Sequence, residues 1–496
     1  MRHRKENDLA SYARETNRVG KVTTRTKFFQ GIGALPETLK QFGFNTFLLL
    51  YYNQVLGLQA SWVSVALFVS IAVDAVTDPI VGSYSDNFRS KLGRRHLLMY
   101  AAALPSGVCL YLLFAPPALD SDFALFAWLA FFTVGTRVSM TFFLVPWNAL
   151  FAEFSDDYEE RSVIVTYRLL LALVAGVVFT FVTFSFIFPS SEAFPQGQLN
   201  PDGYQTFAGV LSICVVSAIL LTTHLTRDQI QYLMQPTHTP EPFRIRRVMP
   251  EVAAALRNRD FLTLIVTVLA STAVVSTSVA LEIYMRTYFW GLGPEDLRWF
   301  GLAYIGALIA FATVVPLQNR IDKKYVMSIC AALSLIDAAG LVALRFLDVL
   351  PDNGDPTLVG LLIVNGVFRA YIGATALIMF ISMVADTLDM QELRTGQRQE
   401  GVFNSATAFM SKATSGMGVL ITGFLLDVVV GFPAGTQAQN VGADTIWRLG
   451  AVDGFLVPAF HIVPMLLILR FGITKDVHRD IRTRLTTLRS NSAGRL

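Results

Sequence analysis

The chain has 496 residues, and its composition assigns it to one class of protein before any motif is considered. Apolar residues make up 53% of it, charged residues only 16%, and the mean hydropathy is +0.49. These values exclude an ordinary soluble protein and predict an integral membrane protein. The formal net charge of +3 matters less than where the cations lie.

Apolar runs long enough to cross a hydrocarbon core of about 30 Å recur along the whole chain. The longest polar connection is rich in proline and divides these runs six and six, which is typical of a transporter built from two six-helix bundles. The expected parts are an N-terminal tail (1–27), a first bundle (28–225), a central loop (226–259), a second bundle (260–471) and a basic tail (472–496). An all-α fold is therefore predicted, with twelve membrane-spanning helices at residues 28–56, 60–85, 96–116, 122–150, 162–188, 204–225, 260–290, 298–317, 325–347, 356–384, 400–431 and 446–470.

The distribution of Lys and Arg predicts the orientation in the membrane. Basic residues precede the first span, follow the second and fill the central loop and the C-terminal tail, whereas the loops at 188–203 and 349–356 contain none. The positive-inside rule then places both termini in the cytoplasm. The first 27 residues are polar and basic, so we expect no cleavable signal peptide and a bacterial inner membrane location. In the first span, Gly31, Gly33 and Pro36 are expected to loosen the cytoplasmic half of the helix.

Two carboxylates stand out inside the second predicted span. Asp74 and Asp78 lie four residues apart, which puts both on one face of a helix, one turn apart. A carboxylate near the bilayer centre costs about 2.5–3.5 kcal/mol on the insertion scale, so a lipid-facing pair would be a heavy burden. We therefore predict that the pair faces a cavity and binds a cation.

The turn that follows the second span has a counterpart in the second half of the chain. It contains Gly82, Asp86, Gly93, Arg94 and Arg95, and a degenerate version follows the eighth span at residues 319–324. This echo indicates an internal repeat. The first turn is similar to the loop motif of the major facilitator superfamily, in which a small residue, an acid and a basic cluster lock two helices at the cytoplasmic face. The similarity implies the fold and nothing finer.

A longer ordered set of motifs carries a more specific resemblance, which extends from Gly31 to about Gly418. In order and spacing it resembles the glycoside-pentoside-hexuronide:cation symporter family (melibiose permease-like) of the major facilitator superfamily. The resemblance implies two six-helix bundles and gating or structural roles for the motif residues outside the site. The set consists of residues 74–79, residues 145–150, Glu153, Asp157, Arg161, Arg168, Asp386, Asp389, the run 392–401 with Arg394 and Arg398, and Lys412.

The same resemblance assigns roles around the acid pair. It makes Asp74 and Asp78 the cation ligands, with Thr77 tuning which cation is accepted. Carboxylates and a hydroxyl can hold sodium, and the same acids could accept a proton instead, so the co-transported ion is sodium or a proton and no other cofactor is expected. Lys412 would neutralise the acids when the ion is absent and yield to it when it binds. The alternative is that the acids only pair with Lys412 and Arg168 to hold helices together.

The chain departs from the family at the sugar site. The family pattern has an acid on helix one, an acid on helix four and an Arg on helix five, and only the Arg is present here, as Arg168. Thr38 stands at the helix-one position with Glu37 beside it, and Leu144 stands at the helix-four position, shortly before Trp147. We count these five residues as candidate substrate contacts, but the pattern argues against a galactoside held by two carboxylates.

Two further arginines lie within predicted spans. Arg137 is near the middle of span four and Arg369 lies at a similar depth in span ten. They could make the substrate cavity cationic and favour an anion such as a hexuronide, another carboxylate or a phosphate headgroup. They could equally be paired within the bundle, for example with Asp337 or Glu37. The sequence leaves both interpretations open.

The first hypothesis is a cation-coupled symporter of a sugar, glycoside or hexuronide that works by alternating access. The second keeps the fold but carries a lysophospholipid or another amphipathic anion, and the third is a sensor that transports nothing. We find no P-loop and no set of nucleophile, base and orienting residue, so neither ATP hydrolysis nor another enzyme activity is expected. The expected partners are a small-molecule substrate and membrane lipids, with no nucleic acid, and a monomer is expected to suffice.

Overall fold

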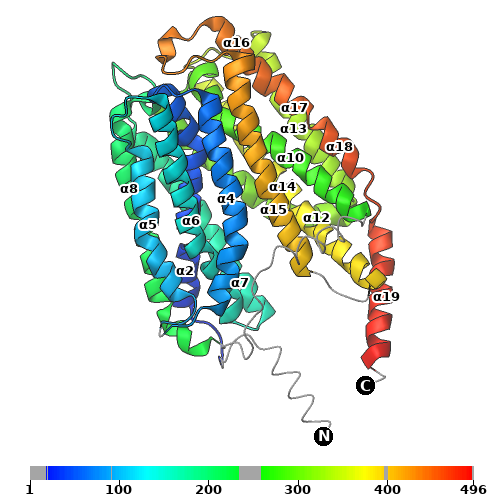
Figure 1. Ribbon diagram of the computed structural model, residues 1–496. Coiled ribbons are helices and arrows are strands. Elements are labelled where there is room, and N and C mark those ends of the chain that lie inside the picture. Colours follow the sequence, from blue (N-terminus) through cyan, green and yellow to red (C-terminus); the bar gives the residue numbers. More distant parts are fainter. Residues whose placement is uncertain (1–17, 19, 91, 234–258, 396–399, 494–496) are drawn as a thin grey trace. The chain divides into compact units, whose positions relative to one another are not determined.

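The computed structural model describes residue 18 and residues 20–90, 92–233, 259–395 and 400–493 (Figure 1). Its contacts divide the chain into two compact units. The first contains the described parts of Met1–Tyr51 and Val69–Phe243, and the second contains Tyr52–Phe68 and the described parts of Arg244–Leu496. Most of the expected central loop lies outside the described residues, so the expected domain boundaries stay a prediction.

Eleven helices among the described residues are long and apolar enough to cross a membrane. Each overlaps one of the predicted spans from the second to the twelfth, which confirms the all-α, multi-pass membrane fold. The total of twelve spans and the cytoplasmic position of the termini stay predictions. The eleven helices are Ala60–Asn87, His96–Phe114, Asp122–Phe154, Glu159–Ile187, Pro201–Leu225, Arg259–Phe289, Pro294–Arg320, Lys323–Phe346, Pro356–Leu393, Met410–Val430 and Ala443–Ile468.

The first predicted span is helical but interrupted. Pro36 has no N–H to donate to the preceding turn, and Gly33 lies where a side chain would collide with an indole ring. A Cβ atom on Gly33 would stand 2.0 Å from Nε1 of Trp147. Close packing therefore explains the glycine, and the missing N–H of Pro36 explains the break after α2. The pieces are α2 (Thr24–Ile32), α3 (Leu35–Phe42) and the wider π-helical turns η1 (Gly43–Leu48) and η2 (Tyr51–Val55).

In the first unit, polar residues immediately before apolar runs fix where the long helices begin. The side chains of Ser121, Asp157 and Asn200 accept hydrogen bonds from the first backbone N–H groups of α6, α7 and α8. Helix α5 packs against both α6 and α8, and α2 packs against α7. The long helices of this unit are α4 (Ala60–Asn87), which belongs to it from Val69 onward, α5 (His96–Phe114), α6 (Asp122–Phe154), α7 (Tyr158–Val182), continued by η3 (Thr183–Ile187), and α8 (Pro201–Leu225).

The second unit has its own apolar core, in which Phe261, Met379, Met383 and Phe471 are almost fully buried. Helix α19 joins this core through Ile481. The main elements are α10 (Arg259–Tyr284), η6 (Met285–Phe289), α11 (Pro294–Leu297), η7 (Arg298–Tyr304), α12 (Ile305–Arg320), α13 (Lys323–Phe346), α14 (Pro356–Thr395), α15 (Glu400–Phe424), η8 (Leu425–Val430), α16 (Ala443–Ala451), η10 (Val452–Leu456), α17 (Val457–Ala459), α18 (Ile462–Ile468) and α19 (Lys475–Ala493).

Candidate functional site: an acid pair in the first unit

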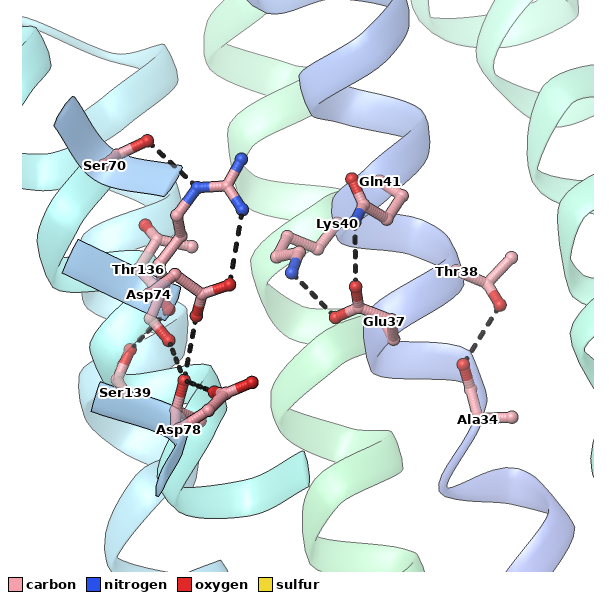
Figure 2. A network of polar contacts seen from close by, with 12 residues as sticks. Ala34, Glu37, Thr38, Lys40, Gln41, Ser70, Asp74, Asp78, Thr136 and Ser139 are labelled. Carbon is pink, nitrogen blue, oxygen red and sulfur yellow. Dashed lines mark hydrogen bonds and ion pairs between the residues drawn. The ribbon is translucent and has the colours of Figure 1, made fainter. Parts of the chain in front are cut away.

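Helix α4 presents Ser70, Asp74 and Asp78 in succession along one face (Figure 2). This arrangement is the one predicted from the four-residue spacing. The hydroxyl of Thr141, on α6, lies 3.0 Å from Oδ1 of Asp74 and 3.0 Å from Oδ1 of Asp78. Packing of α4 near α6 therefore brings two carboxylate oxygens and one hydroxyl oxygen together.

The Thr141 hydroxyl has more acceptors around it than it can serve. It also lies 3.1 Å from the carbonyl oxygen of Arg137, yet it carries only one proton. At any moment its proton can go to only one of these three oxygens. The two carboxylates lie close together, so a bound sodium ion or proton would relieve their mutual repulsion. Oxygen atoms are also the ligands that hard cations prefer.

Arg137 places a positive charge beside this pair. Its Nε donates to Oγ of Ser70 at 2.9 Å, and its Nη1 lies 3.8 Å from Oδ2 of Asp74. The guanidinium also lies 5.2 Å from the ring centroid of Phe44. The ion pair seen here is thus with Asp74 and not with Glu37, one of the partners suggested by the sequence. In Figure 2, Glu37 lies on α3 and accepts instead from Lys40, at 2.7 Å, and from Gln41.

Three other candidate residues make local contacts. The Thr77 hydroxyl donates to the carbonyl oxygen of Asp74 at 3.3 Å, and the Thr38 hydroxyl donates to that of Ala34 at 3.0 Å. Both hydroxyl protons are therefore used within their own helices, although the oxygens keep lone pairs for a ligand. Leu144 is half-buried on α6 and brings no polar group. The tuning role of Thr77 and the substrate roles of Thr38 and Leu144 stay predictions.

Arg168 lies in a second polar cluster of the same unit. Its guanidinium carbon stands 3.7 Å from the ring centroid of Trp147, and its Nη2 donates to Oδ1 of Asn148. Trp147 is fixed in turn by Gln30, because each side chain donates to the other's backbone carbonyl, at 3.0 and 3.1 Å. This places a guanidinium, an amide and an aromatic ring together, as a polar ligand requires. Asn148 was not singled out in the sequence, although it directly follows Trp147.

Ion pairs join the turn after α4 to the end of α6, and the locking role expected for this turn stays a prediction. Glu153, buried near the end of α6, makes ion pairs with Arg94 and Arg95, and Arg95 also contacts Asp86 at 3.1 Å. Gly93 has a φ of +75°, a conformation that favours glycine. Gly82 lies on α4, where a Cβ atom would make only ordinary contact with Val145.

The remaining motif residues lie in both units. Asp157 caps α7, and Arg161 donates to the carbonyl oxygens of Ala152 and Ser155. In the second unit, Asp386 pairs with Lys323 at 2.6 Å, and Asp389 lies 3.3 Å from Nε2 of His478 on α19. The side chain of Arg394 and the whole of Arg398 lie outside the described residues. Lys412 lies on α15 of the second unit, and its coupling role stays a prediction.

Arg369 and Asp337, which the sequence offered as one possible ion pair, both lie in the second unit. Asp337, on α13, accepts from Nδ2 of Asn365 at 2.6 Å, while Arg369 lies on α14. Both side chains line one cavity, which is described below.

The family model described as "MFS/sugar transport protein" matches residues 29–475. The chain belongs to this family. The transporter is 24% identical to the inner membrane symporter YicJ of Escherichia coli (strain K12) over 93% of each chain. It is 21% identical to the isoprimeverose transporter of Lactiplantibacillus pentosus over 81% of each. Its fold resembles that of the nucleoside transporter NupG with a TM-score of 0.59, 12% identity and coverage of 90% of this chain and 99% of that one.

These matches confirm several of the sequence-based predictions. The chain is a multi-pass transporter of the major facilitator superfamily, in the family described as sugar transport proteins, and the relationship to an inner membrane symporter supports the same location here. A transporter of this kind moves a small molecule and works among membrane lipids.

Proposed function

We propose that this transporter is a cation-coupled symporter of a sugar, glycoside or hexuronide. The co-transported ion, sodium or a proton, binds at Asp74 and Asp78 together with Thr141. The single observation that carries this proposal is the convergence of both carboxylates on one hydroxyl, each at 3.0 Å. A purely structural pair would need only one acid for each cation that it holds.

Coupling follows from electrostatics. The neighbouring guanidinium of Arg137 compensates part of the acid pair's charge, and Lys412 would compensate more when the ion is absent. An entering cation competes with these fixed positive charges for the acid pair. Its binding therefore shifts the equilibrium between the inward-facing and outward-facing states of an alternating-access transporter. Each elementary charge that moves down a potential of 100 mV supplies about 2.3 kcal/mol, enough for roughly fifty-fold accumulation of a neutral substrate. A monomer suffices for this mechanism.

The substrate side of the proposal rests on the cluster of Arg168, Trp147 and Asn148. A guanidinium and an amide offer hydrogen bonds to hydroxyl or carboxylate oxygens, and the indole offers an apolar face. The name of the isoprimeverose transporter supports a sugar as cargo. Arg168 would also accommodate the carboxylate of a hexuronide.

A binding experiment tests the cation site separately from transport. Purified protein is titrated with sodium chloride against choline chloride at pH 5.5 and 8, and its thermal stability is measured, because a ligand that binds only the folded state raises stability. We expect sodium to stabilise the wild type, or low pH to do so if the ion is a proton. Asp78→Asn should abolish this response, whereas Asp202→Asn, in the first turn of α8, should keep it. Equal responses in the wild type and Asp78→Asn would overturn the assignment.

A further inference from the structure

The second unit contains a cavity of about 50 Å³ with an unusual lining. Five charged side chains and one amide surround it, although all of them come from helices that cross the membrane. The volume holds a few water molecules, or the edge of a larger ligand. The polar lining consists of Glu282 on α10, Arg286 in η6, Asp337 on α13, Asn365 and Arg369 on α14, and Asp453 in η10.

Part of this lining is already paired. Arg286 forms an ion pair with Glu282 and lies 4.2 Å from the ring centroid of Phe300, and Asn365 donates to Asp337. Arg369 is exposed, and within the described residues it makes no hydrogen bond or ion pair. In the same part of the chain, Oδ1 of Asp453 is buried and has no hydrogen-bond donor. The cavity therefore has a guanidinium that donates no hydrogen bond and a carboxylate oxygen that accepts none, although the charge of Arg369 acts on Asp337 and Asp453.

The mixture of charges selects the kind of ligand. Three carboxylates disfavour a free anion, and two guanidinium groups disfavour a free cation. A hydroxyl group both donates and accepts, so it can join a carboxylate oxygen to a guanidinium N–H. Several hydroxyls on adjacent carbons would use several of these partners at once. Trp290 lines the same cavity and supplies an apolar surface.

We propose that this cavity binds the hydroxyl-bearing edge of a sugar ring. Arg369 donates to ring hydroxyls, and Asp337 and Asp453 accept from them. The inference rests on the proposed function, and it assigns carboxylate contacts to a sugar within the second unit. The cost of placing such charges in membrane-spanning helices is explained by this use.

The test measures ligand-induced thermal stabilisation of the full-length protein in nanodiscs. The probes are methyl β-D-xyloside, methyl β-D-glucoside, D-glucuronate and lysophosphatidylcholine, each with and without sodium at two pH values. The variants are Arg369→Gln and Asp453→Asn. The matched control is Asp444→Asn, an exposed acid on α16, nine residues before Asp453. The cation response of each variant shows that it is folded and that its acid pair is intact.

We expect a sugar probe to stabilise the wild type and Asp444→Asn, and to bind at least tenfold more weakly to Arg369→Gln and Asp453→Asn, with the cation response kept. Unchanged sugar binding in both variants would overturn this inference and leave the proposed function standing. A wild type that responds to the cation but to no sugar probe, or only to lysophosphatidylcholine, would contradict the proposed substrate and this inference together. If Arg369→Gln loses the cation response as well, Arg369→Lys replaces it and should recover that response and only part of the sugar affinity.

Discussion

Thr141 contributes a hydroxyl that both candidate cation ligands share, at 3.0 Å from each carboxylate. We predict that Thr141→Ala lowers the affinity for the co-transported cation about tenfold, since one oxygen ligand or hydrogen bond is worth about 1–1.5 kcal/mol. Thr141→Ser keeps the hydroxyl and should retain most of the affinity. Isothermal titration of the purified variants measures the difference. Equal affinities for Thr141→Ala and Thr141→Ser would rule out a role for the hydroxyl.

Arg137 lies 3.8 Å from Asp74, so its charge opposes a cation entering the same site. We predict that Arg137→Gln strengthens cation binding roughly threefold or more, because a like charge next to the ion is removed. The stability of the variant without the ion should fall, since Asp74 loses its charged partner. Thermal stability with and without the ion measures both effects, and Arg448→Gln, an exposed arginine on α16, is the control. Weaker cation binding in Arg137→Gln would show that the guanidinium supports the ion site instead of competing with it.

At the scale of elements, the turn after α4 depends on one buried acid that serves two arginines. Glu153→Gln leaves Arg94 and Arg95 without that carboxylate, and breaking a buried ion pair costs about 3–5 kcal/mol. We predict a lower midpoint in thermal unfolding. Glu192→Gln, an exposed acid in the loop after η3, is the matched control and should leave the midpoint unchanged. If both variants unfold at the wild-type temperature, the turn does not act as a lock.

Gly33, at the break between α2 and α3, packs closely against Trp147 of α6. Gly33→Ala would place a methyl group 2.0 Å from Nε1 of Trp147, and such overpacking costs about 1–3 kcal/mol. Trp147 would also move relative to Arg168, so sugar binding should weaken together with stability. Gly209→Ala on α8 meets nothing within 4 Å and should be neutral or slightly stabilising. Tryptophan fluorescence and thermal unfolding report the two effects. A stable Gly33→Ala variant with an unchanged spectrum would contradict the packing account.

At the scale of the whole molecule, the sequence was sufficient where periodicity and local chemistry decide the structure. The position of eleven spans and the common face of Asp74 and Asp78 follow from hydropathy and from helical spacing. Thr141 could not be predicted in this way, because its role depends on how α4 packs near α6. Its only sequence signal is its position four residues after Arg137, on the same helix face.

The sequence also could not predict which charged residues, distant along the chain, would pair. Arg137 could have met any of several acids, and only the fold shows that it lies beside Asp74. The cavity around Arg369 joins residues from α10, η6, α13, α14 and η10, which no local pattern connects. Contacts of this kind are set by tertiary packing, whereas the helices themselves are set by the membrane, which requires every backbone group to be satisfied within its own segment.

The most direct test of the central claim is uptake of a radiolabelled sugar into proteoliposomes under separately imposed gradients of sodium and of pH. Isoprimeverose, methyl β-D-xyloside and D-glucuronate are the substrates, and the wild type is compared with Asp74→Asn and Asp78→Asn. We predict accumulation of one of these sugars above equilibrium under one gradient only, and its loss in both variants. Accumulation that persists in Asp74→Asn and Asp78→Asn, or that needs neither gradient, would contradict cation coupling through the acid pair.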